Sequence, residues 1–327
     1  MSSPALAFGS TRSLPTRTDG SSAIGAAVAA LSDARSAWLA RQEEARDVDS
    51  FPSRDAVERI IAQLAAALYP RRLGLFRGPA AETDRFVAAK LIAALADLER
   101  EVRSELDYWQ PEARANFEAD QPATIVQLFA GTLGEIRRLV DTDVEAACRA
   151  DPAARSVDEV LVCYPGAIAS LHHRIAHQLD ALGAPIVARI ISELANERTG
   201  IDIHPGATIG AHFFIDHGTG VVIGETAIIG ERVRLYQHVT LGARSAFGPV
   251  ADGPASRHAR HPIVGDDVVI YAGATILGRV RIGDRATIGG NVWLLSDVAA
   301  DAVVVQPEAV QLTADGARDA LVQGGGR

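Results

Sequence analysis

The C-terminal half of the chain carries aliphatic residues at a strict spacing of six, and this spacing limits the fold more than any other feature of the sequence. An α-helix repeats its buried positions about every 3.6 residues and a strand every second residue, so neither produces this period. It is typical of a β-helix whose triangular coil turns a corner every six residues and points one aliphatic side chain inward from each face. We therefore predict a left-handed parallel β-helix over residues 199–305. The aliphatic positions form three runs: Ile203, Ile209 and Ile215; Ile223, Ile229, Leu235 and Leu241; and Val264, Ile270, Ile276, Ile282, Ile288 and Leu294.

The preceding part of the chain has a helical pattern instead. Apolar residues recur at spacings of three and four, as in Val57, Ile60 and Leu64, which is the periodicity of an amphipathic helix. We predict an α-helical domain over residues 51–198. The fold class is then α+β, with the helical domain preceding the β-helix.

Composition narrows the classes of function. The formal net charge is −9, which argues against nucleic acid or an anionic membrane as the main partner. No apolar run is long enough to span a bilayer and the N-terminus lacks the apolar core of a secretory signal, so we expect a cytoplasmic protein. Cys148 and Cys163 stand outside any CxxC pattern and are expected to be reduced thiols.

The two ends of the chain are expected to lie outside both domains. Residues 1–50 are rich in Ser, Thr, Ala and Arg, and we predict a flexible N-terminal segment there, with an organellar transit peptide as the less favoured alternative. Residues 306–327 follow the last coil and are predicted to form a C-terminal tail.

The period of six is interrupted twice, and polar residues gather at both interruptions. The step from Ile215 to Ile223 is eight residues long and contains the segment Asp216-His217-Gly218-Thr219-Gly220. Between Leu241 and Val264 the chain leaves the coil in a loop, residues 243–262, which ends in Arg260-His261-Pro262. Long loops without secondary structure often carry function.

These residues suggest acid–base and anion-binding chemistry. His217 is a candidate general base because it stands at a register break beside glycines that let a substrate approach, although a surface corner histidine is equally consistent with the pattern. Asp202, fifteen residues earlier, either orients that imidazole or serves as a cap or turn residue. Arg260 and His261 either clamp a carboxylate or belong to a solvated basic loop.

A second histidine pair lies in the helical half. His173 and His177 are four residues apart, which is the spacing of a metal-binding pair on a helix. No third ligand accompanies them, so we expect packing or capping roles and predict no metal site.

Several stretches together resemble the serine O-acetyltransferase family of hexapeptide-repeat acyltransferases. The resemblance runs from about Asp151 to Asp297, and its most specific strings are DIHP and DHGTGVVIGET. The stretches that carry it are Asp151-Pro152-Ala153-Ala154, His173-Arg174-Ile175-Ala176-His177, Thr199-Gly200-Ile201-Asp202-Ile203-His204-Pro205, Asp216-His217-Gly218-Thr219-Gly220-Val221-Val222-Ile223-Gly224-Glu225-Thr226 and Arg260-His261-Pro262.

The resemblance implies that acetyl-CoA, a co-substrate, donates its acetyl group to the hydroxyl of L-serine, and that this transfer needs no metal. The product, O-acetylserine, is used for cysteine biosynthesis. The resemblance also implies homotrimers, commonly paired into a dimer of trimers. The roles carried over are those of His217 as base, Asp202 as its orienting carboxylate, Asp151 and Asp216 as the serine ammonium site, Arg260 and His261 as the carboxylate site, and Gly242, Ala272 and Gly290 as neighbours of the coenzyme.

The sequence departs from many relatives in two places. Ala243 stands where a glycine is usual, and the loop that follows it is longer. Many relatives end in an isoleucine that binds O-acetylserine sulfhydrylase, whereas this chain ends in Gly324-Gly325-Gly326-Arg327, which argues against that partner.

Two other functions remain open on the sequence alone. One is an acetyltransferase with another hydroxyl acceptor, such as homoserine or a sugar, against which the paired acids and the Arg260–His261 pair argue. The other is a zinc-dependent carbonic anhydrase on a similar solenoid, which needs three histidines on one metal. The candidates for that metal are His204, His212, His217 and His238.

Overall fold

The protein is described by a computed structural model that covers residues 20–41, 51–110, 113, 116–244 and 258–307. The chain divides into two compact units, Met1–Asp47 and Val48–Arg327. Among the residues described, no helix has both the length and the apolar character needed to cross a bilayer.

The described part of the first unit, residues 20–41, forms helix α1 (Gly20–Leu39). The sequence pattern did not predict it, because it lies inside the segment expected to be flexible. Its alanine-rich sequence has high intrinsic helix propensity, while side chains such as Ile24 and Leu31 are exposed. Propensity rather than burial therefore accounts for this helix.

The second unit begins with the predicted helical region. Helix ends follow local chemistry: the Ser53 hydroxyl accepts the Ala56 N–H at the start of α2, Pro165 occupies the first turn of α6, and Gly200 ends α7 at φ +70°, where glycine carries no steric penalty. The elements are α2 (Arg54–Leu68), η1 (Ala80–Glu82), α3 (Thr83–Trp109), α4 (Gln121–Ala150), α5 (Val157–Cys163), α6 (Pro165–Ala181) and α7 (Pro185–Thr199).

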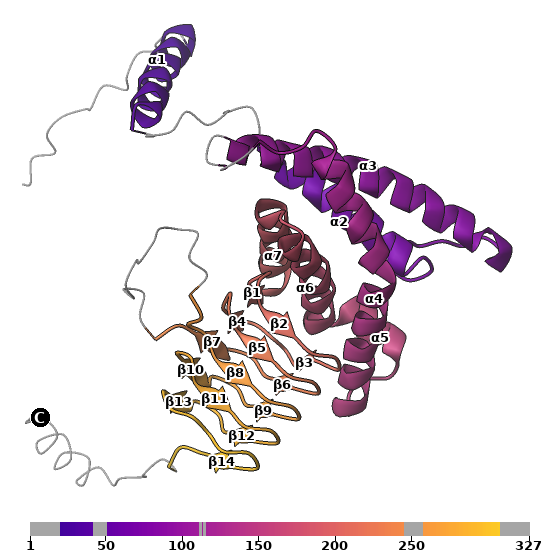
Figure 1. Ribbon diagram of the computed structural model, residues 1–327, viewed down its shortest axis with the longest axis vertical. Helices are drawn as coiled ribbons and strands as arrows, with labels where there is room; N and C mark the ends of the chain where they lie inside the picture. The colour runs from indigo at the N-terminus through magenta and orange to yellow at the C-terminus, as the bar shows by residue number, and fades with distance from the viewer. Residues whose placement is uncertain (1–19, 42–50, 111–112, 114–115, 245–257, 308–327) are drawn as a thin grey trace, which may run out of the picture. The chain divides into compact units, whose positions relative to one another are not determined.

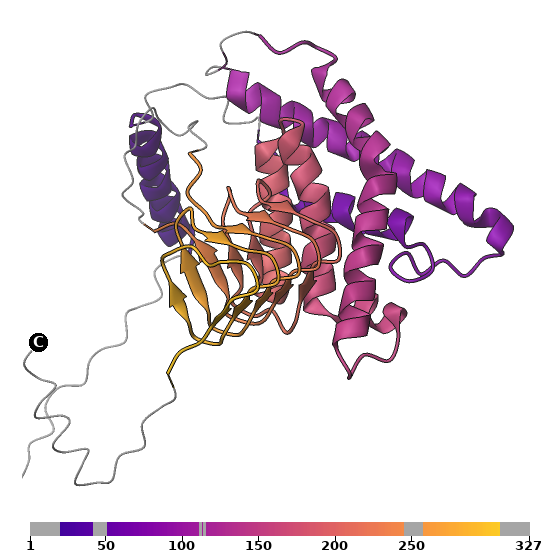
Figure 2. The same cartoon turned by 60° about the horizontal axis from the view of Figure 1, so that its bottom comes forward.

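The described residues after α7 form a parallel β-helix of short strands in three sheets (Figures 1 and 2). Sheet A contains β1 (Asp202–Ile203), β4 (Val222–Ile223), β7 (Thr240–Gly242), β10 (Thr275–Leu277) and β13 (Trp293–Leu294). Sheet B contains β2 (Thr208–Ile209), β5 (Ile228–Ile229), β8 (Ile263–Val264) and β11 (Arg281–Ile282). Sheet C contains β3 (Phe214–Ile215), β6 (Arg234–Leu235), β9 (Val269–Ile270), β12 (Thr287–Ile288) and β14 (Val303–Val304).

The predicted fold class and order of elements are confirmed. Every aliphatic residue in the three runs is buried in the centre of the coil. The eight-residue step does not disturb this register, because Ile215 still pairs with Leu235 and Ile223 with Leu241. The two extra residues are therefore absorbed in the corner that follows β3.

A buried ion pair joins the helices to the first coil. Arg174 of α6 donates two hydrogen bonds of 3.1 Å to Asp143 of α4, and it also donates to the carbonyl oxygen of Gly210 at 2.6 Å. The Phe213 N–H completes the pair by donating to Asp143 at 2.9 Å. Burial raises the pKa of Asp143, while Arg174 opposes that shift. Because these bonds link α4 and α6 to the start of the β-helix, they set where the end of α4 meets the coil.

Candidate active site

His217 lies in the corner between sheets C and A that contains the two extra residues. Its backbone is left-handed, with φ +57°, and its side chain is 72% exposed. The Nδ1 atom lies 3.8 Å from Oδ1 of Asp216. The corner therefore presents an accessible imidazole beside a carboxylate, as a base acting on a bound molecule requires.

Two residues of the helical region reach the same corner. Asp151 follows the last turn of α4, and its Oδ2 accepts the Tyr164 hydroxyl at 2.5 Å while its Oδ1 accepts the Ala153 N–H at 2.8 Å. These bonds, with a smaller contribution from nearby His217, lower the pKa of Asp151. The same contact raises the pKa of Tyr164 to about 12, and Glu159 and Asp216 add to that shift. The structure thus brings Asp151, Asp216 and His217 together and adds Tyr164, which the sequence analysis missed.

Close packing of α6 makes this meeting possible. Gly166, in the first turn of α6, lies so near β3 that a Cβ atom there would overlap the carbonyl oxygen of Ile215. The start of α6 consequently sits directly on the residue before Asp216, with Tyr164 immediately before the helix. The proline at the start of α6 marks this helix end in the sequence, but it gives no information on how close the helix lies to the β-helix.

Asp202 occupies the first position of β1, beside Val222 of β4. Its Oδ1 lies 3.9 Å from Nη2 of Arg189 on α7. Within the described chain, no hydrogen bond or ion pair joins Asp202 to His217. Its role as the orienting carboxylate stays a prediction.

Arg260 and His261 lie at the other end of sheet A, in the corner between sheets A and B. The Thr226 hydroxyl oxygen accepts the backbone N–H groups of Arg260 and His261 at 2.9 and 3.1 Å. The Arg260 guanidinium donates to Glu225 at 2.8 Å. Thr226, which the sequence analysis did not single out, therefore fixes the end of the loop at residues 243–262, of which residues 245–257 lie outside the described chain.

The tautomer of His261 follows from its contacts. Its Nδ1 accepts the Thr226 N–H at 3.0 Å, so in the neutral ring the proton is on Nε2. Burial and the Arg260 charge lower the pKa of His261 to about 4, which keeps the ring neutral near pH 7. His261 can then donate one N–H to an anion.

The two groups of predicted residues are held apart on one chain. Residues 221–224 separate the His217 corner from Glu225 and Thr226, and extended residues each span about 3.3 Å, giving about 13 Å. The ammonium and carboxylate of an amino acid share one carbon atom. The predicted residues on one chain therefore form two separate groups, termed half-sites, with Asp151, Asp216 and His217 in one and Arg260 with His261 in the other. That the two groups bind one amino acid stays a prediction.

The residues predicted near the coenzyme are also divided between the His217 corner and the Arg260 side of sheet A. Ala272 and Gly290 lie in successive coils of the corner that contains His217, where the Asn291 N–H donates to the Ala272 carbonyl at 2.9 Å. Gly242 ends β7, on the Arg260 side of sheet A. Their part in coenzyme binding stays a prediction.

In the histidine pair of the helical half, His173 is buried and His177 is half-buried. His173 is 3% exposed and its ring centroid lies 5.7 Å from that of His177. The Nδ1 of His177 lies 2.8 Å from the carbonyl oxygen of Pro205, so this ring contacts the first coil. In the described ranges, no three His, Cys, Asp or Glu side chains converge as metal ligands.

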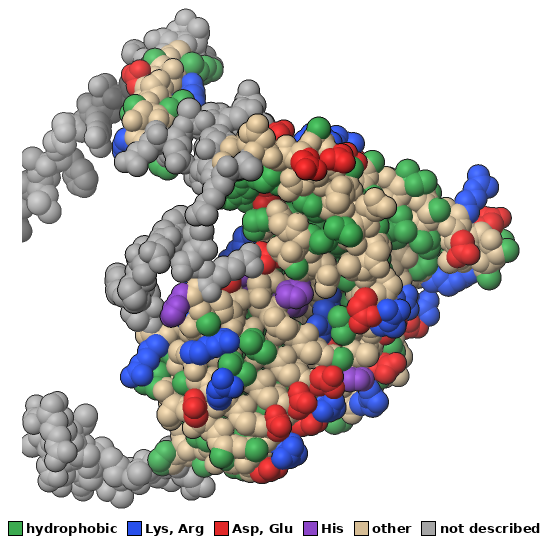
Figure 3. All heavy atoms as spheres, in the orientation of Figure 1, with side chains coloured by type: hydrophobic (Ala, Val, Ile, Leu, Met, Phe, Trp, Pro, Cys, Tyr) green, Lys and Arg blue, Asp and Glu red, His purple; other side chains and the backbone are tan. Residues whose placement is uncertain are grey.

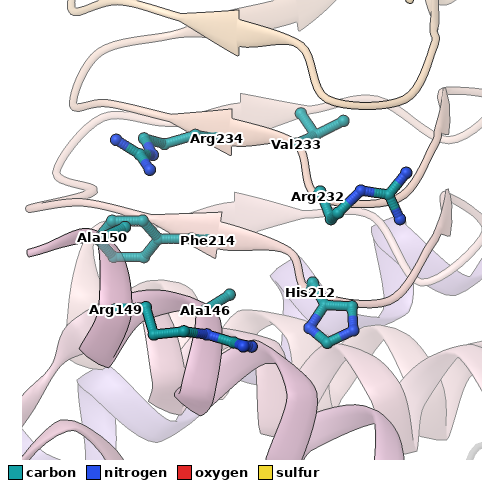
Figure 4. A pocket seen from close by; sticks show the side chains of 8 residues that line it. All are labelled: Ala146, Arg149, Ala150, His212, Phe214, Arg232, Val233 and Arg234. Atoms are coloured by element: carbon teal, nitrogen blue, oxygen red, sulfur yellow. The ribbon is translucent and has the colours of Figure 1, made fainter. Parts of the chain in front are cut away.

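A pocket of about 300 Å³ lies elsewhere, between the end of α4 and sheet C (Figure 4). Arg149, His212, Arg232 and Arg234 line it, and none of the residues predicted to bind serine or the coenzyme does. Asp267 accepts two hydrogen bonds from Arg232, and Glu145 lies 3.5 Å from Arg149. Because carboxylates compensate Arg232 and Arg149, and the Arg234 guanidinium lies over the Phe214 ring, we assign no ligand to this pocket.

Comparison with known proteins gives a consistent result. Residues 261–296 match the family model described as bacterial transferase hexapeptide (six repeats). The chain is 46% identical over 86% of its length to the plasmid serine acetyltransferase of Synechococcus elongatus, covering 90% of that protein, and 48% identical over 50% of its length to the serine acetyltransferase of Mycobacterium tuberculosis, covering 67% of that protein.

Solved structures agree. A serine acetyltransferase isoform 3 from Entamoeba histolytica, in complex with cysteine, aligns with a TM-score of 0.67 and 33% identity over 81% of this chain and 87% of that chain. The fold match includes the helical region as well as the β-helix. Given identity of this level over most of its length, the chain belongs to the serine acetyltransferase family.

Proposed function

We propose that the protein transfers the acetyl group of acetyl-CoA to the hydroxyl of L-serine, producing O-acetylserine and free coenzyme A. The cluster of Asp151, Tyr164, Asp216 and His217 carries this proposal, since it places two carboxylates beside an accessible imidazole. Paired carboxylates suit a primary ammonium, and the imidazole suits the adjacent hydroxyl. O-acetylserine is then available for cysteine synthesis.

The chemistry needs one base and no metal. His217 takes the proton of the serine hydroxyl as the oxygen attacks the thioester carbonyl carbon. The carbon–sulfur bond breaks when the tetrahedral intermediate collapses, and the coenzyme leaves as a thiol after the imidazolium returns the proton. A hydroxyl is a poor nucleophile near pH 7, and a positioned base is worth about 10²–10⁴ in rate.

We infer that each complete site forms between two copies of the chain. The ammonium half-site of one copy meets the Arg260–His261 half-site of the next, so that the two ends of serine are held by different copies. A cyclic trimer repeats this contact three times without leaving an unused half-site. The exposed side chains of Val222 and Trp293 on sheet A support a face that packs against another copy.

A thiol-release assay tests the function. With acetyl-CoA present, we expect L-serine to give the highest kcat/KM among serine, homoserine and simple sugars. Replacing His217 by alanine should lower kcat by about 10²–10⁴ while the protein stays folded, because the proton acceptor is lost. Preference for homoserine would redirect the substrate assignment, and a His217→Ala rate above half that of the wild type would contradict the base mechanism.

A further inference from the structure

We propose that Tyr164 is a positioning residue for the acceptor ammonium, acting through Asp151 and making the enzyme selective for acceptors that carry an amine. The inference rests on the proposed function and extends it to a residue outside the predicted set. It starts from the 2.5 Å hydrogen bond that the Tyr164 hydroxyl donates to Oδ2 of Asp151.

The first step is the geometry of the Asp151 carboxylate. Each oxygen has one fixed donor, the Tyr164 hydroxyl on Oδ2 and the Ala153 N–H on Oδ1. A carboxylate oxygen accepts more than one hydrogen bond, so both oxygens keep acceptor capacity for an ammonium. The two donors remove the rotational freedom of the group before a ligand arrives, which reduces the entropy lost on binding.

The second step is charge. The bond from Tyr164 is the largest cause of the lowered pKa of Asp151, so this carboxylate stays ionised near pH 7. The carboxylates of Asp151, Glu159 and Asp216 raise the pKa of Tyr164 to about 12. The phenol consequently remains a neutral donor and adds no negative charge of its own.

The third step is placement. Because Gly166 lets the start of α6 lie on Ile215, Tyr164, which immediately precedes this helix, bonds to Asp151 beside the residue that comes before Asp216. Asp151 comes from the end of α4 and Asp216 from the first coil. Tyr164 therefore lies where the two carboxylates from different parts of the fold approach the His217 corner, and it orients the one from the helices.

The variant Tyr164→Phe tests this role, with Tyr69→Phe as matched control. Tyr69 also donates to a carboxylate, Asp141, at 2.9 Å, but it lies in the helical core. In Tyr164→Phe we expect KM for serine to rise about tenfold, with kcat within twofold and KM for acetyl-CoA unchanged, since one charge-assisted bond is lost. Tyr69→Phe should leave both KM values at the wild-type level.

A comparison of two acceptors distinguishes a positioning role of Tyr164 from a general loosening of the active site. The assay compares serine with 3-hydroxypropanoate, which has the same hydroxyl and carboxylate but no amine. Tyr164→Phe should lower the serine to 3-hydroxypropanoate ratio of kcat/KM about tenfold, and Asp151→Asn should lower it further. A parallel rise of KM for serine and acetyl-CoA, or an unchanged ratio, would overturn the role of Tyr164.

The outcomes keep the two proposals distinct. If the wild type does not acetylate serine, the proposed function fails and this inference fails with it. If the wild type acetylates serine and Asp151→Asn raises KM, but Tyr164→Phe behaves like Tyr69→Phe, only the inference about Tyr164 is wrong.

Discussion

Among single residues, Gly224 shows how closely the Arg260–His261 half-site is packed. A Cβ atom at this position would overlap the imidazole ring of His261, at its Cδ2 and Nε2 atoms. These atoms belong to the edge that carries the ring proton, because Nδ1 is held by Thr226. The glycine therefore makes room for the Nε2 edge of His261.

We expect Gly224→Ala to raise KM for serine about tenfold or more, with a smaller effect on KM for acetyl-CoA, because the ring must move away from its Thr226 contact. The added methyl group should also lower the free energy of unfolding by about 1–3 kcal/mol. Steady-state kinetics and urea unfolding measure the two effects.

A control comes from Gly131, in the middle of α4, where a Cβ atom would meet nothing within 4 Å. Gly131→Ala should leave both KM values unchanged and stabilise the protein by about 0.5–1 kcal/mol, since alanine favours the helix. If Gly224→Ala behaved in the same way, the contact with His261 would not hold the ring in place.

Sequence patterns predict some site residues but not their supporting contacts. His217 is visible because the period of six breaks around it, and Arg260 because a loop ends there. Tyr164 and Thr226 support Asp151 and the Arg260–His261 pair through hydrogen bonds between segments far apart in sequence. No periodicity records such contacts, because they depend on how α6 docks on the coil and where the loop returns.

Among the elements, α7 has its N-terminal N–H groups capped by a residue from another helix. It begins at Pro185 after Ala184, which offers no side-chain cap. Glu105 of α3 takes this place by accepting the N–H groups of Ile186 and Val187 at 2.7 and 2.9 Å. Glu105 is fully buried. Its burial raises its pKa to about 7, although the two backbone bonds act in the opposite direction.

This raised pKa predicts a pH dependence of stability. Between the usual value of 4.5 and about 7, the folded state holds a proton that the unfolded state has released, so the free energy of unfolding falls as the pH rises through this window. The loss is about 3 kcal/mol. His261, whose pKa is lowered to about 4, acts with the opposite sign, since its contribution is lost as the pH falls from about 6.5 to 4.

Comparison with Glu105→Gln isolates the glutamate, because the histidine contributions cancel. The stability of the wild type relative to this variant should decrease by about 3 kcal/mol between pH 4.5 and 7.5, as measured by urea unfolding. Parallel pH profiles for the two proteins would show that Glu105 titrates normally.

The corners of the coil explain why the β-helix was predictable in its core and not on its surface. Aliphatic residues inside each face repeat every six residues except at the two interruptions, so their period reports the fold directly. At the corner between sheets B and C, the left-handed positions carry charged or polar residues that pair between coils, as Arg232 does with Asp267 and Arg285 with Asp301. Figure 3 shows acidic and basic side chains intermixed along an edge of this region. These pairs follow from stacking of neighbouring coils and leave no period of six in the sequence.

For the whole molecule, the separation of the two half-sites has the largest consequence. About 13 Å of extended chain lies between the His217 corner and Thr226, while the proposed function requires one serine to contact both half-sites. Sheet A lies between these ends, and its strands present Val222 and Trp293 to solvent. We therefore expect a particle of at least three times the 34.5 kDa chain, measurable by light scattering.

Co-expression of two inactive variants tests whether the sites are shared. A His217→Ala chain retains its Arg260 half-site, and an Arg260→Ala chain retains its His217 half-site. In equal random mixture, about a quarter of the contacts between copies unite two intact halves, so about a quarter of the wild-type kcat/KM for serine should return. His217→Ala mixed with Asp151→Asn is the control, because both changes fall in the same half-site and no contact can be complete. Recovery in neither mixture, or a fully active monomer at micromolar concentration, would place both ends of serine on a single chain and overturn the shared site.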